Sequence, residues 1–124
     1  MNASISSHFA IIEPSKVRDY IRMQPLNFLP VGTREYMATG KISFNQTAED
    51  GESGLSYNQE LSLVTQNRDV ARYAGCRKYL AFFMSDGSLR MIGTPSTAPL
   101  LKITPHEGAY RLEVSFRSPE PLPL

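Results

Sequence analysis

The chain has 124 residues, with 13 Lys and Arg against 12 Asp and Glu, a formal net charge of +1 and 41% hydrophobic residues. This size fits one domain with its own core, and the composition excludes a wholly disordered chain and a strongly basic nucleic-acid binder. The single cysteine, Cys76, excludes an internal disulfide, and no apolar run approaches the roughly 20 residues of a membrane-spanning helix. Because no targeting signal is evident, we expect a soluble, cytoplasmic protein without a membrane partner.

Strand patterns dominate the first half of the chain. Residues 9–13 predict a strand that Pro14 ends, and residues 17–23 fit either a strand or one face of a helix, of which we favour the strand. Apolar and polar residues then alternate through residues 36–44 and again through residues 55–63. Because an acidic, glycine-containing segment separates these two runs, they predict one long antiparallel hairpin.

A short helix is predicted over about residues 67–75. Thr65 or Asn67 can cap its first amides, Asp69 suits its positive amino end, and Gly75 supplies a stop. We expect this helix to cover one open end or one face of the sheets.

The most apolar segment, residues 79–84, is hydrophobic on both faces and therefore predicts a central strand. Asp86 and Gly87 follow it and are a strong signal for a two-residue hairpin turn. The partner strand is predicted at residues 89–92, so these residues together form a second hairpin.

The last two strands are predicted at residues 100–103, which Pro105 ends, and at residues 110–117, where alternation is strict. The three prolines of residues 118–124 prevent ladder pairing and favour an extended backbone. We therefore divide the chain into a single β domain, residues 1–117, and a proline-rich carboxyl-terminal arm, residues 118–124. The expected fold is mainly β, an antiparallel β-sandwich or a partly open barrel with the one short helix.

Residue types that support catalysis are sparse. His106 lies in a predicted loop, Cys76 precedes Arg77 and Lys78, and no serine has the sequence context of a nucleophile. We interpret His106 as an exposed loop residue and Cys76 as a small buried side chain. The sequence thus predicts no catalytic residue, no cofactor, no bound metal and no enzymatic activity.

Charged residues gather in two places. Glu49, Asp50 and Glu52 lie between the arms of the long hairpin, where they indicate a solvated tip or a mobile segment that becomes ordered against a partner; an ion site is the third interpretation. Arg68 and Arg72 are one helical turn apart and predict a small positive patch. Because the net charge is near zero and no nucleic-acid-binding motif is present, we expect no recognition of a nucleic-acid sequence.

The second half of the chain combines three segments, YLAFFMSDGSLRMIGTP at residues 79–95, PLLKIT at residues 99–104 and YRLEVSFR at residues 110–117. With this order of apolar strand, turn, Gly-Thr-Pro stop and closing strand, the sequence over about residues 55–117 resembles small uncharacterised β-rich proteins of Bacteroides-type prophage and mobile-element regions. The resemblance implies a structural role in a phage tail or its connectors, where small β subunits pack in rings and make contacts through loops and arms. It implies no catalytic residue.

These observations predict a non-enzymatic structural or assembly protein, such as a phage-tail-like or connector component, whose partners are copies of itself. Self-association would use sheet edges, the long hairpin and the carboxyl-terminal arm. The alternative is a monomeric ligand-binding β module with a cleft between the helix and the hairpin. The candidate interaction residues are Glu49, Asp50, Glu52, Arg68, Arg72, Pro119, Pro121 and Pro123.

Overall fold

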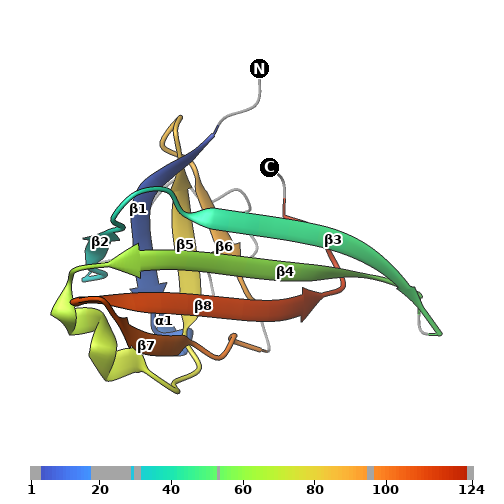
Figure 1. Cartoon of the computed structure of the whole chain (residues 1–124). Coiled ribbons are helices and arrows are strands. Elements are labelled where there is room, and N and C mark those ends of the chain that lie inside the picture. The colour runs from blue at the N-terminus through green and yellow to red at the C-terminus, as the bar shows by residue number, and fades with distance from the viewer. Residues whose placement is uncertain (1–3, 18–28, 30–31, 53, 95–96, 123–124) are drawn as a thin grey trace.

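The computed structural model describes residues 4–17, 29, 32–52, 54–94 and 97–122. These residues form two antiparallel four-stranded sheets with the strand orders β2-β1-β5-β6 and β3-β4-β8-β7. Figure 1 shows one sheet in front of the other, with their strands crossing steeply, as in the orthogonal class of sheet packing. The predicted antiparallel β-sandwich is confirmed, and the described strands do not close into a barrel.

Each half of the chain supplies one hairpin-like pair of strands to each sheet. The first sheet contains β1 (Ile5–Ile12), β2 (Glu35–Met37), β5 (Tyr79–Met84) and β6 (Leu89–Ile92), and the second contains β3 (Ser43–Gly51), β4 (Gly54–Thr65), β7 (Lys102–His106) and β8 (Ala109–Ser118). In both halves the strands follow in the order central, edge, edge, central. A one-turn helix, α1 (Pro14–Val17), follows β1, and a 3₁₀ helix, η1 (Arg68–Tyr73), joins the two halves.

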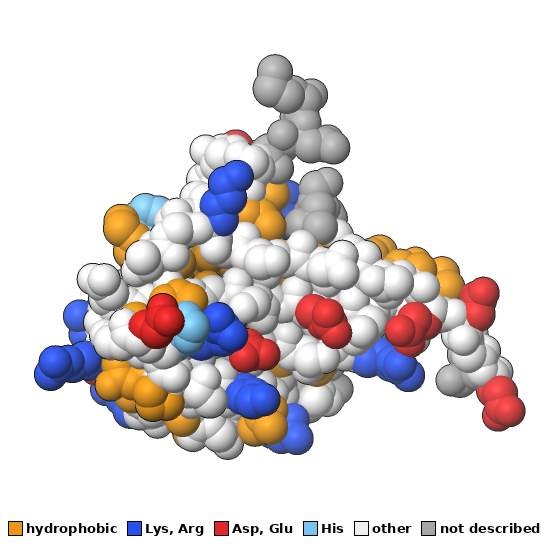
Figure 2. Space-filling view, in the orientation of Figure 1, with side chains coloured by type: hydrophobic (Ala, Val, Ile, Leu, Met, Phe, Trp, Pro, Cys, Tyr) orange, Lys and Arg blue, Asp and Glu red, His pale blue; other side chains and the backbone are white. Residues whose placement is uncertain are grey.

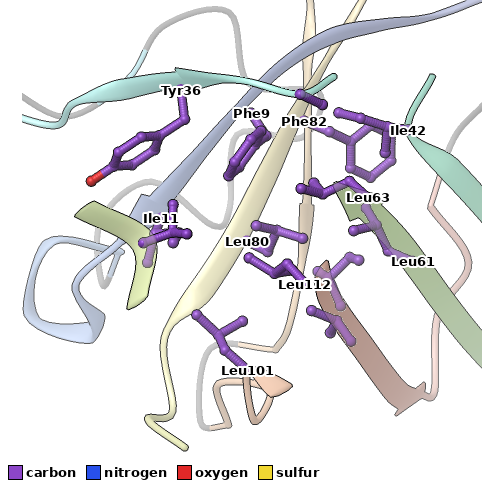
Figure 3. Packing of buried hydrophobic residues seen from close by; sticks show 14 of the residues in the cluster. Phe9, Ile11, Tyr36, Ile42, Leu61, Leu63, Leu80, Phe82, Leu101 and Leu112 are labelled. Atoms are coloured by element: carbon purple, nitrogen blue, oxygen red, sulfur yellow. The ribbon is translucent and has the colours of Figure 1, made fainter. Parts of the chain in front are cut away.

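Alternate side chains of both sheets fill the space between them. Figure 3 shows Phe9, Leu80 and Phe82 of the first sheet directed toward Leu61 and Leu112 of the second. All five side chains are at most 2% exposed. Because burial of a large apolar side chain contributes about 1.5–3 kcal/mol, this shared interior is the main source of stability.

The first arm of the long hairpin differs from the prediction. Residues 36–44 do not form one strand, because Tyr36 pairs with Phe9 in the first sheet and β3 of the second sheet begins only at Ser43. Gly40 lies between them with a φ of +81°, a conformation that strains a residue with a side chain. The chain therefore passes from one sheet to the other here, a change that alternation alone does not reveal.

The predicted helix is present, but as the short 3₁₀ segment η1 rather than an α-helix. Asn67 caps it as predicted, since its side chain accepts the N–H of Asp69 at 3.0 Å. Gly75 follows its end with a φ of +76°. Val70 is fully buried and anchors η1 on the shared core, so this short connector is held mainly by tertiary packing.

Two predicted strand boundaries are wrong. Val17 belongs to α1 rather than to a strand, and the rest of the predicted strand at residues 17–23 lies outside the described residues. Pro105 lies inside β7 instead of ending a strand. The reason is that β7 is an edge strand, where a residue without an N–H can remain in the ladder.

The prediction for β5 is confirmed, because it pairs with β1 on one side and β6 on the other. The turn after β5 has one residue more than predicted. The N–H of Gly87 donates to the carbonyl of Met84 at 3.0 Å, and Met84 pairs again with Ser88. Gly87 takes a φ of +89°, which makes this a three-residue connection with a glycine bulge.

No helix among the described residues is long and apolar enough to cross a membrane.

Candidate functional site

The four edge strands of the described sheets differ in how well they are protected. β2 has three residues and β6 has four, so both are too short to template much pairing. β7 contains Pro105, which has no N–H to donate. β3 has nine residues, no proline and no described strand beside its outer edge. Among the described strands, β3 is therefore the edge best suited to accept another strand.

The hairpin of β3 and β4 extends beyond the rest of the second sheet. β8 ends opposite Tyr57, so the residues of the hairpin from Glu49 to Ser56 have no described third strand beside them. Figure 1 shows this end projecting from the body at the right. We call the described residues of this projection, 49–52 and 54–56, the hairpin tip.

The three acidic residues predicted at the tip all lie there. Glu49 accepts a hydrogen bond from Arg117 at 2.6 Å, and both side chains are exposed, so water screens this ion pair. Asp50 lies opposite Leu55, whose side chain is 51% exposed, and Glu52 is exposed in the turn. Figure 2 shows acidic side chains on the projection. The tip thus presents carboxylates beside an apolar side chain.

The carboxyl-terminal tail is attached to the hairpin, which corrects the expectation of an arm that leaves the domain. The N–H of Leu122 donates to Gln46 Oε1 at 2.9 Å, and Gln46 Nε2 donates to the Leu122 carbonyl at 3.3 Å. Buried Gln59 donates to the same Gln46 oxygen at 3.0 Å, and Leu122 packs against the shared core. Of the candidate prolines, Pro119 and Pro121 are exposed and Pro123 lies outside the described residues.

The basic candidates lie at the opposite end of the molecule from the tip. Arg68 and Arg72 belong to η1, which follows the far end of β4. Because β4 has 12 residues, about 35 Å separates η1 from the tip. Arg72 is already engaged, since its Nη2 donates to the Tyr73 hydroxyl at 2.7 Å. The structure therefore does not bring the acidic and basic candidates together.

A charged network that joins β2 to η1 was not predicted. Asp69 accepts hydrogen bonds from Arg34 Nη1 at 2.9 Å and from the Tyr36 hydroxyl at 3.1 Å, and Arg72 Nη2 lies 3.6 Å away. Burial, together with hydrogen bonds to Tyr73 and Asp69, raises the pKa of Tyr36 to about 12. Tyr36 therefore remains a neutral donor at neutral pH, and the network holds η1 in place. The two donors to the Asp69 carboxylate, Tyr36 and Arg34, lie 33 and 35 residues away in the chain, so no local motif indicates these hydrogen bonds.

His106 lies beside a shallow hollow of about 360 Å³ at the turn between β7 and β8. Its Nε2 is 3.4 Å from Arg111 Nη2 and 3.9 Å from Glu107 Oε2. Glu107 and Gly108 form the two-residue turn with φ values of +46° and +81°. An arginine and an exposed carboxylate beside the ring form no pair of nucleophile and base, so the geometry explains a turn rather than a reaction.

The outer face of the second sheet is polar and slightly hollowed. A depression of about 660 Å³ is lined by residues from all four strands of this sheet and by Leu100. Glu113 is one of these residues, with Ser62 opposite it on β4 and Lys102 opposite it on β7. Figure 2 shows this face, where acidic and basic side chains are scattered among polar ones. Hydroxyl, carboxylate and ammonium groups here can hydrogen-bond to a hydroxyl-rich ligand.

The described residues hold no group of three or more His, Cys, Asp or Glu side chains placed to bind a metal ion. The candidate functional site consists of the edge of β3 and the hairpin tip. In comparisons with known proteins, no family model, no curated protein and no solved structure matches the chain.

Proposed function

We propose that the protein is a non-enzymatic structural subunit that assembles with copies of itself through the hairpin of β3 and β4. The observation that carries the proposal is the nine-residue edge of β3, beside which no described strand lies. Alternate residues of an unpaired edge point their N–H and C=O groups outward, and a further strand can satisfy them. An edge of this length is a template for pairing unless something blunts it.

The residues of β3 themselves have little that would prevent such pairing, and the tail bonds to the side chain of Gln46 rather than to its main chain. It pairs with β4 in continuous register from Ser43 to Gly51, so no bulge twists the edge away. Its charged residues, Glu49 and Asp50, lie only toward the tip, and the preceding residues of the strand are uncharged. Charges and bulges usually protect the edge strands of natural proteins from pairing with another chain. Their absence from most of β3 therefore favours the interpretation that this edge binds a further strand.

The hairpin tip supports the same proposal. A two-stranded projection is only marginally stable in water, and a partner would stabilise it. Leu55 can be buried in such a contact while Asp50 and Glu52 set its polarity. The proposal includes the phage-tail-like or connector role that the resemblance of residues 55–117 implies, because subunits of such particles make contacts through exposed edges and projections of this kind.

The test is the oligomeric state of the whole chain, measured by size-exclusion chromatography with light scattering over a concentration series. We expect the mass to rise from that of a monomer as the concentration increases. A shortened hairpin, in which Asn-Gly replaces residues 50–55 and joins the existing pair Glu49 and Ser56, should need at least tenfold higher concentration to associate.

The matched control changes the other two-residue turn to the same sequence through Glu107→Asn, which places Asn before Gly108. This control should associate like the unaltered chain. A strict monomer at millimolar concentration would overturn the proposal, and equal association of the shortened hairpin would exclude the hairpin as the contact.

A monomeric ligand-binding module is the second candidate, favoured by the depression of about 660 Å³ on the outer face of the second sheet. A thermal-shift screen against mono- and oligosaccharides tests it, because a ligand that binds only the folded state raises the Tm. A stabilising sugar should lose its effect in Glu113→Gln and keep it in Glu120→Gln, a matched change outside the depression. The absence of any stabilising sugar would reject this function.

A further inference from the structure

The register of the second sheet shows which main-chain groups of β3 face outward. Gly51 and Gly54 flank the turn of the hairpin and so form a hydrogen-bonded pair, from which bonded and non-bonded pairs alternate along β3. The pairing of β4 with β8 and of β8 with β7 extends the same alternation to the other edge of the sheet, where it predicts that His106 and Ala109 are a hydrogen-bonded pair. The two-residue turn between His106 and Ala109 requires the same pair to be bonded, so the assignment is consistent. The residues of β3 whose N–H and C=O groups face outward are therefore Phe44, Gln46, Ala48 and Asp50.

We propose that β3 pairs antiparallel with β3 of a second copy, in the register that places Thr47 opposite Thr47 on a two-fold axis. This inference rests on the proposed function and names its contact. Only this register uses all nine residues of both strands. Phe44 then exchanges hydrogen bonds with Asp50, and Gln46 with Ala48, so every outward group of both edges is satisfied. The second sheet of one copy and the second sheet of the other then form one continuous sheet.

The side chains are compatible with this register. On the outer face Asn45 lies opposite Glu49, and the two Thr47 side chains form a pair of a kind that stabilises antiparallel strands. No two like charges face each other. A register shifted toward the tip shortens the overlap and moves the two Glu49 carboxylates closer together, which is unfavourable.

Charge complementarity adds to the backbone argument. With Gly51 opposite Ser43, the turn of one copy continues alongside residues 41 and 42 of the other. Lys41 is exposed there, and Glu52 is exposed in the turn. Each copy thus brings an acidic turn beside a lysine of its partner, and the two-fold axis repeats the contact.

Pairing along one edge buries less than the roughly 800 Å² per partner of a standard interface, so we expect a weak, concentration-dependent dimer. The axis at Thr47 gives a direct test. Thr47→Lys and Thr47→Glu each place two like charges together, so each variant alone should associate at least tenfold more weakly than the unaltered chain. An equimolar mixture of the two should recover a heterodimer, measured by light scattering and by native mass spectrometry.

Ser115→Lys is the matched control, because it adds the same charge to the outer face of the same sheet at a position that is not on the edge. It should dimerise like the unaltered chain. Full association of Thr47→Lys, or no recovery in the mixture, would overturn the proposed contact.

Disulfide trapping tests the register itself. In a non-bonded antiparallel pair the Cα atoms are about 4.5 Å apart, within the range that a disulfide spans. In a Cys76→Ser background, Thr47→Cys should form a covalent dimer on oxidation. Asn45→Cys should not, because its counterpart lies several residues away along the partner strand, whereas Asn45→Cys with Glu49→Cys should.

Failure of this contact and failure of the proposed function give different results. If the unaltered chain is a monomer at all concentrations, the assembly function is wrong. If it associates but Thr47→Lys associates equally and Thr47→Cys does not crosslink, the subunit assembles through another surface, and shortening the hairpin then shows whether that surface is the tip.

Discussion

The two sheets have the same number of strands but differ in their outer faces. The outer face of the first sheet belongs to a second apolar cluster, in which Ala10, Ile12, Tyr79, Ala81, Leu89 and Met91 of the sheet pack with Ala98, Leu29 and Phe83. The corresponding face of the second sheet carries Ser62, Glu113 and Ser115. Among the residues that the structure describes, the first sheet is therefore enclosed on both sides, and the second is covered on one side only.

Part of the described cover of the first sheet comes from the segment that follows β6. Lys78 N–H donates to the Pro99 carbonyl at 3.2 Å, and Leu101 N–H donates to the Cys76 carbonyl at 2.9 Å. These bonds fasten the segment alongside the chain that enters β5, so Ala98 is held over the outer apolar cluster. The difference between the sheets teaches that, among the described residues, the first sheet has both faces buried, whereas the second leaves one face and one long edge exposed, where the proposed contacts lie.

The largest effect is expected in the interior that both sheets share. Phe82 is 0% exposed, and the centroid of its ring lies 5.1 Å from the ring centroid of Phe44 on the other sheet. Phe82→Ala leaves a cavity and should lower the free energy of unfolding by about 4 kcal/mol. Denaturant unfolding measures this loss, and a loss below about 1 kcal/mol would show that the sheets do not pack as described.

The cover of the first sheet should be nearly as sensitive at Gly93. A Cβ atom there would lie 2.5 Å from two carbons of the Tyr79 ring, and the φ of +132° strains any side chain. Gly93→Ala should therefore cost about 3 kcal/mol, from overpacking and strain together. Gly40→Ala is the matched control: its φ is +81° but nothing lies within 4 Å, so only about 1 kcal/mol of strain is expected. Equal losses for the two variants in chemical unfolding would contradict the close approach.

The comparison of outer faces has its own test. Met91 is 0% exposed although it lies on the outer side of the first sheet, so Met91→Ala should cost about 2–3 kcal/mol, as for a core residue. Ser115→Ala, on the outer side of the second sheet, should change stability by less than about 0.5 kcal/mol. Thermal unfolding of both variants decides the point, and similar losses would remove the distinction between the sheets.

The smallest effect concerns pH, at the link between β2 and η1. The pKa of Tyr36 is about 12 in the fold and about 10 in the unfolded chain, so the fold favours the protonated hydroxyl. This contribution to stability is complete below pH 10 and is lost as the pH rises toward 12. Tyr36→Phe should lower the free energy of unfolding by about 1 kcal/mol at pH 7. The Tm of this variant should also fall less steeply above pH 10. Part of the fall should remain, because burial also raises the pKa of Tyr79. Parallel curves for the variant and the unaltered chain would refute this.

Much of the fold could be predicted because its signals are local. The apolar residues of β5 indicate a strand buried on both faces, and Asn67 and Gly75 mark the ends of η1 through their own backbone geometry. The acidic residues between two alternating runs correctly indicate the hairpin tip. In each of these cases the physical cause lies within a few residues of its effect, so sequence periodicity and capping rules suffice.

The candidate site could be predicted only in part, because it depends on pairs far apart in the chain. Nothing near Gln46 indicates that it binds Leu122, 76 residues away, so the sequence by itself predicts a free tail. Likewise, nothing in residues 36–44 distinguishes one strand of a hairpin from two strands in different sheets. The open edge of β3 follows from which strands happen to lie beside it.

By itself, the amino-acid sequence determined which side chains of β4 and β8 face an apolar interior, because burial follows the alternation within those strands, and it indicated that β5 is buried on both faces. Only the tertiary structure decided which sheet each strand joins, which of the four described edges stays long and open, and which outer face is covered. Those outcomes depend on hydrogen bonds and packing between segments remote in the chain, which no local pattern encodes.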